Sequence, residues 1–160
     1  MRLLHYPAQA EVISDQKPGL GSHTDFEVRT YFLSITIFNT FFEFPQCFTI
    51  LWQDEVPALQ VKNATGQWVD AQPIPGTFII NIGDQLSRWT NDIFKSTVHR
   101  VINKSGVQRY SIPLFFSIDH DVKVEVLPSC ISDNRPARYE PIIAGDYVKS
   151  NLEKTYAYLP

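Results

Sequence analysis

Two histidines and one aspartate have residue types and a spacing that suit a metal ion. His23 and Asp25 are two positions apart, and His99 follows far downstream. In an extended segment residues i and i+2 point to the same side, so His23 and Asp25 can chelate one ion from a single strand end. Two neutral imidazoles and one carboxylate suit one face of an octahedral ferrous ion and leave the opposite face open for a co-substrate and dioxygen. The pattern predicts an iron(II) site formed by His23, Asp25 and His99.

A second group of residues suits an acidic co-substrate. Arg109 comes ten residues after His99 (109 − 99 = 10), and Ser111 falls on the same face of a predicted strand. The planar guanidinium matches a carboxylate with two hydrogen bonds, and the serine hydroxyl can donate one more. Tyr6, on the first predicted strand, is a further candidate donor to the same acid. The alternatives are a surface ion pair for Arg109 and simple packing for Tyr6.

The remaining histidines are weaker candidates for metal ligands. His120 lies in a predicted turn and has no second histidine at a useful spacing, and His5 could compete only as a lone ligand. We expect neither to bind the metal. An isolated histidine such as His99 is more often a core residue, and it is the combination with H-x-D upstream and R-x-S downstream that favours the metal.

The elements that must position these residues are predicted to be mostly strands. Short runs rich in β-forming residues alternate with turns, as in an antiparallel sandwich or jelly roll. The predicted strands cover residues 48–52, 59–61, 77–82, 97–101 and 110–118, and residues 63–69 are predicted to be a hairpin turn that enters another strand. Pro113 suggests that the last one is an edge strand or contains a bulge. A loop at 128–141 is followed by one predicted helix over 144–156, where apolar residues recur at helical intervals.

Composition limits the class of protein. A chain of 160 residues with 44% hydrophobic and 13% aromatic residues is one globular domain or most of one. Its net charge of −3 gives no footprint for nucleic acid or an anionic membrane, and no apolar stretch is long enough for a membrane helix. Cys47 and Cys130 have neither metal-type nor redox-type spacing, which indicates buried thiols in a reducing compartment. The expected location is cytoplasmic.

With these residues in view, the chain resembles the 2-oxoglutarate- and iron(II)-dependent dioxygenases of the isopenicillin N synthase-like family. The resemblance covers most of the chain. It is carried most specifically by the runs Pro75-Gly76-Thr77-Phe78, Asn81-Ile82-Gly83-Asp84, Arg88-Trp89-Thr90-Asn91, Lys95-Ser96-Thr97-Val98-His99-Arg100-Val101 and Arg109-Tyr110-Ser111-Ile112-Pro113.

The resemblance implies a double-stranded β-helix, or jelly roll, with a C-terminal helix. It implies iron held by His23, Asp25 and His99, and 2-oxoglutarate anchored by Arg109 and Ser111. The implied reaction is oxidation of a small organic molecule by dioxygen, through hydroxylation, desaturation or ring closure, with release of succinate and carbon dioxide. Two alternatives remain: an inactive jelly-roll module that binds a ligand, and an oxidase of the isopenicillin N synthase type that needs no 2-oxoglutarate. The substrate and the oligomeric state are not predicted.

The chain departs from the family pattern at its start. Family members carry an N-terminal region before the strand that opens the barrel, and here the sequence begins at that strand. We therefore expect a fragment rather than a minimal enzyme, with an exposed apolar face and an incomplete pocket. The expected domains are an oxygenase barrel over residues 1–127 and a C-terminal loop and helix over 128–160.

A second departure is the distance between Asp25 and His99, which is 74 positions (99 − 25 = 74). Removing residues 28–46 would shorten it to the 55 that the family leads us to expect. The segment holds five of the chain's 11 Phe and only two charges, Arg29 and Glu43. Our hypothesis is a retained in-frame intron, since T-rich intron sequence encodes Phe, Ile and Leu. The alternative is a genuine insertion that forms a lid or a dimer contact. An apolar segment here can act in two ways, by displacing the carboxylate of Asp25 or by favouring β-aggregation, and we expect the chain to bind iron poorly.

Overall fold

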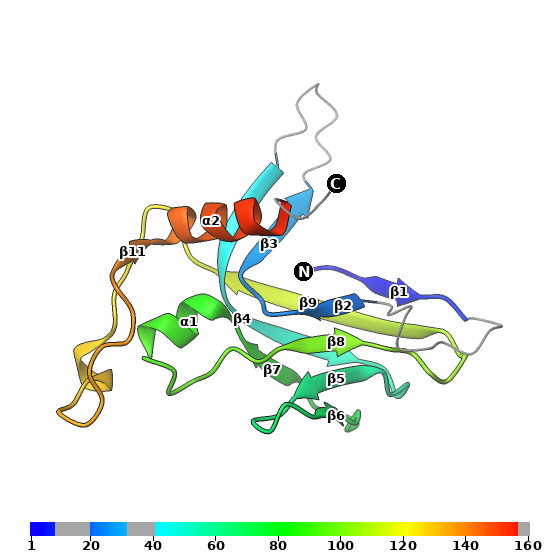
Figure 1. Ribbon diagram of the computed structural model, residues 1–160. Coiled ribbons are helices and arrows are strands. Elements are labelled where there is room, and N and C mark those ends of the chain that lie inside the picture. The colour runs from blue at the N-terminus through cyan, green and yellow to red at the C-terminus, as the bar shows by residue number, and fades with distance from the viewer. Residues whose placement is uncertain (9–19, 32–40, 157–160) are drawn as a thin grey trace. The chain divides into compact units, whose positions relative to one another are not determined.

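The computed structural model describes residues 1–8, 20–31 and 41–156 and is built mainly from antiparallel strands (Figure 1). Its strands are β1 (Leu4–Tyr6), β2 (Leu20–His23), β3 (Glu27–Tyr31), β4 (Phe41–Gln53), β5 (Leu59–Lys62), β6 (Trp68–Asp70), β7 (Ile79–Ile82), β8 (His99–Val101), β9 (Arg109–Ser117), β10 (Lys123–Val124) and β11 (Ile142–Ile143). Its helices are α1 (Asp84–Trp89), a 3-10 turn (Pro128–Cys130) and α2 (Ala144–Tyr156). The mainly β class with a C-terminal helix is as predicted.

The described chain divides into two compact units. The first contains Met1–Thr24, Thr49–Asn81 and Thr97–Leu114, and the second contains Asp25–Phe48, Ile82–Ser96 and Phe115–Pro160. Strands β4 and β9 contribute residues to both units.

The first unit contains a four-stranded antiparallel sheet in the order β2-β8-β5-β6 (Figure 1). Its apolar face packs at Leu59 and Val101, which are directly opposite each other in β5 and β8 and are both about 5% exposed or less. The next pair in register, Gln60 and Arg100, lies on the other face and is linked by an Arg100 Nε to Gln60 Oε1 hydrogen bond of 2.8 Å. Successive side chains thus point to opposite faces of the sheet, and the polar pair is buried in part, with Gln60 8% exposed.

A second sheet has the order β1-β9-β4-β3, with β7 pairing β4. Pro113 lies in β9, between β1 and β4, so the predicted edge position is wrong. The ring removes one donor, but the Pro113 carbonyl still accepts a 3.0 Å hydrogen bond from the main-chain N–H of Arg2. Residues 27–31 pair with 41–45 as neighbouring antiparallel strands, which places both ends of the predicted insertion in regular structure. Residues 32–40 lie outside the described part of the chain.

Cys47 behaves as the sequence predicts. It is 3% exposed, and burial raises the pKa of its thiol to about 11. Such a thiol stays protonated near neutral pH and is a poor nucleophile. Cys130 is only half-buried, because it lies in the 3-10 turn, and both cysteines are free.

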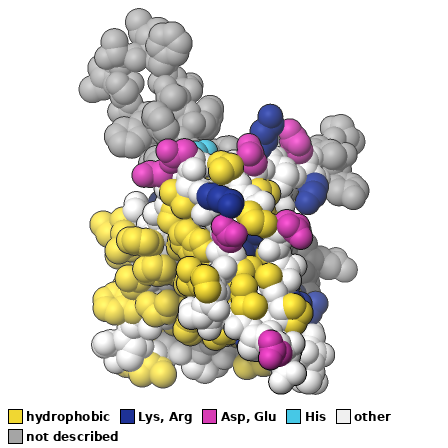
Figure 2. All heavy atoms as spheres, turned by 90° about the vertical axis from the view of Figure 1, so that its left-hand side faces the viewer, with side chains coloured by type: hydrophobic (Ala, Val, Ile, Leu, Met, Phe, Trp, Pro, Cys, Tyr) yellow, Lys and Arg dark blue, Asp and Glu magenta, His cyan; other side chains and the backbone are white. Residues whose placement is uncertain are grey.

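Large hydrophobic side chains are exposed in both units, in line with the exposed apolar surface expected from the sequence. Examples are Phe78 (63% exposed) and Ile80 (55%) in the first unit, and Phe94 and Phe116 (both 55%) in the second. Figure 2 shows hydrophobic side chains gathered on the face that it draws, with charged groups between them. No helix among the described residues is long and apolar enough to cross a membrane.

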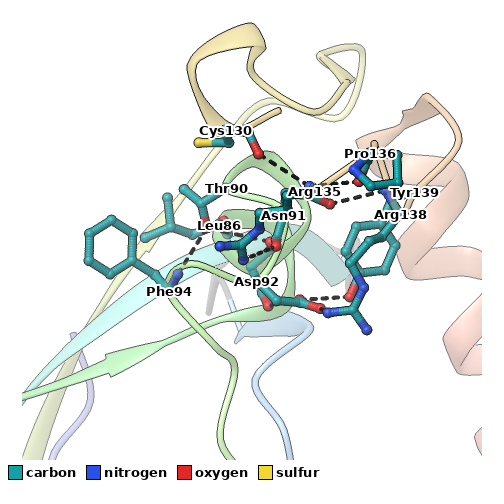
Figure 3. Close-up of polar contacts among 11 residues, drawn as sticks. Leu86, Thr90, Asn91, Asp92, Phe94, Cys130, Arg135, Pro136, Arg138 and Tyr139 are labelled. Carbon is teal, nitrogen blue, oxygen red and sulfur yellow. Dashed lines mark hydrogen bonds and ion pairs between the residues drawn. The ribbon is translucent and has the colours of Figure 1, made fainter. Parts of the chain in front are cut away.

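The second unit contains α1, which the sequence reading missed, and a buried asparagine directly after it (Figure 3). Asn91 is fully buried and has a left-handed backbone, with φ of 53°. Its Nδ2 donates to the carbonyls of Cys130 and Pro136 at 3.2 and 3.0 Å, and its Oδ1 accepts from the main-chain N–H of Arg138 at 3.0 Å. One side chain thus ties the end of α1 to the loop at 128–141.

Replacing Asn91 with alanine is expected to lower the free energy of unfolding by about 3 kcal/mol. The change leaves the buried main-chain groups that Asn91 contacts without a hydrogen-bond partner. It also removes the side-chain hydrogen bonds that offset the cost of the left-handed backbone at this position. Urea denaturation measures the difference. The matched control is Asn134→Ala in the same loop, where the side chain is exposed and the expected change is within about 0.5 kcal/mol. Equal losses for the two variants would contradict the assignment of Asn91 as the anchor.

Candidate metal centre and carboxylate site

The two histidines of the predicted triad are brought together by strand pairing in the first unit. His23 ends β2, His99 begins β8, and the two are directly opposite in the antiparallel register. Their rings lie 4.3 Å apart between centroids. The Nδ1 of His23 is 2.8 Å from the carbonyl oxygen of Gly21, and the Nδ1 of His99 is 3.0 Å from that of Thr97. Since a carbonyl can only accept, these contacts favour the tautomer with the proton on Nδ1, which presents Nε2 as the ligand atom.

Asp25 follows His23 in the chain, with only Thr24 between them. The ligand atoms of His23, Asp25 and His99 all lie within 4.8 Å of one another. Atoms bound to one small transition-metal ion lie about 3–4 Å apart, because metal–nitrogen and metal–oxygen bonds are about 2.1 Å long. Two imidazoles and one carboxylate are a donor set that suits iron(II), and an ion bound here would draw the ligand atoms in from separations of up to 4.8 Å.

The carboxylate of Asp25 is held by a neighbouring amide in the second unit. Asp25 is 9% exposed, and its Oδ2 accepts a 2.7 Å hydrogen bond from Nε2 of the fully buried Gln46. Its main-chain carbonyl accepts from the N–H of Asp84 at 2.9 Å. The displacement of this carboxylate that we expected from the inserted segment is therefore not observed, because the last residue of that segment holds it.

Arg109 and Ser111 lie on one face of β9 in the first unit and are almost completely buried, at 1% and 2% exposure. Arg109 donates through Nη2 to Gln53 Oε1 at 3.0 Å and through Nη1 to Ser111 Oγ at 3.4 Å. The guanidinium carbon is 5.1 Å from the ring centre of Tyr6, which is opposite Arg109 in β1. The surface ion pair that we kept as an alternative is wrong, since Arg109 is not at the surface.

The buried guanidinium has only neutral hydrogen-bond partners among the described residues, and its Nε has none. Burial lowers the pKa of Arg109, and Tyr6 and Asp54 offset part of this effect. A buried cation that lacks a counter-charge in contact is costly, so binding of an anion here is favourable. A carboxylate is the anion that fits the planar fork of arginine.

The other two histidines make different contacts. His5 stacks on the ring of Tyr110 with 4.7 Å between centroids, and His120 lies beside Gly145 at the start of α2. Neither belongs to the one group of metal-type ligands found among residues 1–8, 20–31 and 41–156. The sequence did not predict a role for Gln46, which contacts Asp25, or for Gln53, which contacts Arg109. Nothing in their spacing marks them, because each is defined by a partner far away in the chain.

Comparison with known proteins gives consistent matches. A family model described as the 2OG-Fe(II) oxygenase superfamily matches residues 42–118, which include His99, Arg109 and Ser111. The 2-oxoglutarate-Fe(II) type oxidoreductase hxnY of Emericella nidulans is 42% identical over 159 residues, covering 98% of this chain and 40% of that protein. Homoarginine-6-hydroxylase 2-ODD-233 of Oryza sativa subsp. japonica is 34% identical over 150 residues, covering 92% of this chain and 40% of the relative.

Solved structures agree with these relatives. A full-length Neurospora crassa protein in complex with alpha-KG has a TM-score of 0.74 and 35% identity, over 94% of this chain and 43% of the other. The dioxygenase for auxin oxidation from rice has a TM-score of 0.76 and 26% identity, over 96% and 46%. The likeness confirms the predicted jelly-roll fold, and the chain spans about two fifths of the length of the curated relatives. The chain belongs to the 2OG-Fe(II) oxygenase superfamily.

Proposed function

We propose that this chain carries the metal and co-substrate sites of an oxygenase that depends on iron(II) and 2-oxoglutarate and oxidises a small organic molecule. The observation that carries the proposal is the gathering of His23, Asp25 and His99, whose ligand atoms lie within 4.8 Å of one another. These three side chains would hold the iron, which when bound activates dioxygen. One 2-oxoglutarate and one dioxygen would yield succinate, carbon dioxide and one oxygen atom for the substrate.

Arg109 and Ser111 would bind the carboxylate of 2-oxoglutarate that is distant from the keto group. Arg109 offers a fixed, buried fork, and Ser111 adds a hydroxyl on the same strand face. Tyr6 lies against the guanidinium and would contribute its hydroxyl to the same acid. Low exposure strengthens each of these hydrogen bonds, since water does not compete for them.

The substrate class is a small molecule rather than a polymer. One relative is named for homoarginine hydroxylation, and another structure of the Neurospora crassa protein contains thymine. We also propose that residues 1–127 form the barrel domain, that 128–160 follow it as loop and helix, and that the location is cytoplasmic. These assignments and the partners, a small-molecule substrate and dioxygen without nucleic acid or membrane, rest on the sequence.

Turnover of 2-oxoglutarate tests the proposal. The purified protein is incubated with iron(II), ascorbate and 2-oxoglutarate labelled at carbon 1. The label released as carbon dioxide and the unlabelled succinate are each measured. We expect slow release of both in equal amounts, abolished by a chelator. Metal binding without any 2-oxoglutarate binding would favour the isopenicillin N synthase type of oxidase. Binding of neither would favour a ligand-binding module and would refute the proposal.

A further inference from the structure

A buried glutamine contacts the candidate metal ligand Asp25. Gln46 lies in β4 and is completely inaccessible to solvent. Its Nε2 donates to Asp25 Oδ2 at 2.7 Å, and both side chains belong to the second unit. A short amide-to-carboxylate bond between two buried side chains orients both of them.

The main chain around this bond is fixed by close packing at Gly83. A β-carbon added at Gly83 would lie 2.7 Å from the carbonyl oxygen of Gln46 and 3.0 Å from that of Asp25. The N–H of Gly83 donates to the carbonyl of Cys47 at 2.7 Å, and the N–H of Asp84 donates to that of Asp25 at 2.9 Å. The glycine therefore lets the segments that carry Asp25 and Gln46 approach the same turn, so the amide is held in place before any ion binds.

The bond has a direct consequence for metal coordination. An aspartate has two oxygens and can bind a metal ion through one or through both. Because the amide of Gln46 occupies one side of Oδ2, we infer that Asp25 would bind the ion that His23 and His99 would share through its other oxygen, Oδ1. Outer partners of this kind fix the orientation of a ligand and strengthen metal binding.

We propose that Gln46 is a positioning residue that orients Asp25 as a ligand bound through one oxygen. The inference rests on the proposed metal function. It also gives a role to the final position of residues 28–46, the segment that is additional to the family pattern. Whatever the origin of that segment, its last side chain is part of the support of the metal site.

Anaerobic titration with cobalt(II) tests the inference, since its absorption reports the number of bound ligand atoms. Gln46→Met keeps the volume of the side chain and removes the donor. We expect its dissociation constant for cobalt(II) to rise by about 10- to 100-fold. The absorption intensity should also change as Asp25 becomes free to bind through both oxygens. Gln60→Met is the matched control, because Gln60 is 8% exposed and donates to Asp70 at 2.8 Å; there we expect a change within about twofold.

A double-mutant cycle separates positioning from a general structural effect. In an Asp25→Ala background, Gln46→Met should leave the residual affinity of the two histidines unchanged, whereas an equal loss in both backgrounds would assign Gln46 a structural role. If Gln46→Met binds cobalt(II) as tightly as the parent, with the same spectrum, the inference is overturned and the proposed function stands. If the parent protein shows no cobalt(II) binding that depends on His23 and His99, the proposed function itself fails. A Gln46→Leu variant, which also removes the donor, replaces Gln46→Met if that protein does not fold.

Discussion

Asp25→Asn is expected to weaken iron(II) binding by more than about 100-fold. Loss of an outer hydrogen-bond partner of a metal ligand already costs about 10- to 100-fold in affinity, and loss of a charged ligand costs more. The variant keeps the shape of the side chain, so packing near Gln46 is preserved. His99→Ala should have a similar effect, because it leaves one imidazole and one carboxylate. Anaerobic titration with iron(II), monitored by calorimetry, measures the dissociation constants of both variants.

The same loss should appear in thermal unfolding. An ion that binds only the folded state stabilises it in proportion to the logarithm of its concentration over the dissociation constant. Iron(II) should therefore raise the melting temperature of the parent and leave that of Asp25→Asn almost unchanged. His5→Ala is the control, since His5 stacks on Tyr110 and lies outside the triad. A parent-like response to iron by Asp25→Asn would remove Asp25 from the metal site.

The sequence predicts strands well where one face is buried. Leu59 and Val101 lie in runs that the sequence predicts to be strands, and the structure places them opposite each other in the core. The pairing of His23 with His99 is different in kind, because 76 positions separate them (99 − 23 = 76) and only the sheet register brings them together. The combination of H-x-D upstream with R-x-S downstream favoured a shared metal site, and the family resemblance implied the same ligands. The residue types alone left a core histidine as an alternative.

The features that the sequence did not predict have identifiable causes. Helix α1 has six residues, too few for a periodic apolar pattern to show. The edge position predicted for Pro113 is wrong, since β9 lies between β1 and β4. A proline is tolerated there because its carbonyl still accepts a hydrogen bond from the main-chain N–H of Arg2. Gln46 ends a segment that we interpreted as a retained intron or as a lid or dimer contact, and neither interpretation predicts its hydrogen bond with Asp25. The poor iron binding expected from that segment remains a prediction, although the displacement on which it rested is not observed.

Replacing Arg109 with methionine is expected to weaken 2-oxoglutarate binding by about 100-fold or more while changing the free energy of unfolding little. The affinity falls because a two-bond, charge-assisted contact with a carboxylate is lost, at a cost of about 3 kcal/mol. Stability changes little because the variant also removes a buried charge whose described hydrogen-bond partners, Gln53, Ser111 and Tyr6, are neutral. Replacing such a charge with an apolar group of similar size is often neutral or stabilising.

The opposite pattern is expected for Arg100→Met, which serves as the control. Arg100 packs 4.1 Å from the ring centre of Trp68 and donates to Gln60, so its loss should lower stability and leave 2-oxoglutarate binding intact. Arg109→Lys should fall between the parent and Arg109→Met, since it keeps the charge but not the planar fork. Titration of the metal-loaded proteins with 2-oxoglutarate, paired with urea unfolding, gives both quantities for each variant. If Arg109→Met lost stability and kept its affinity for 2-oxoglutarate, the buried guanidinium would be structural. Another residue would then have to bind the distal carboxylate of 2-oxoglutarate.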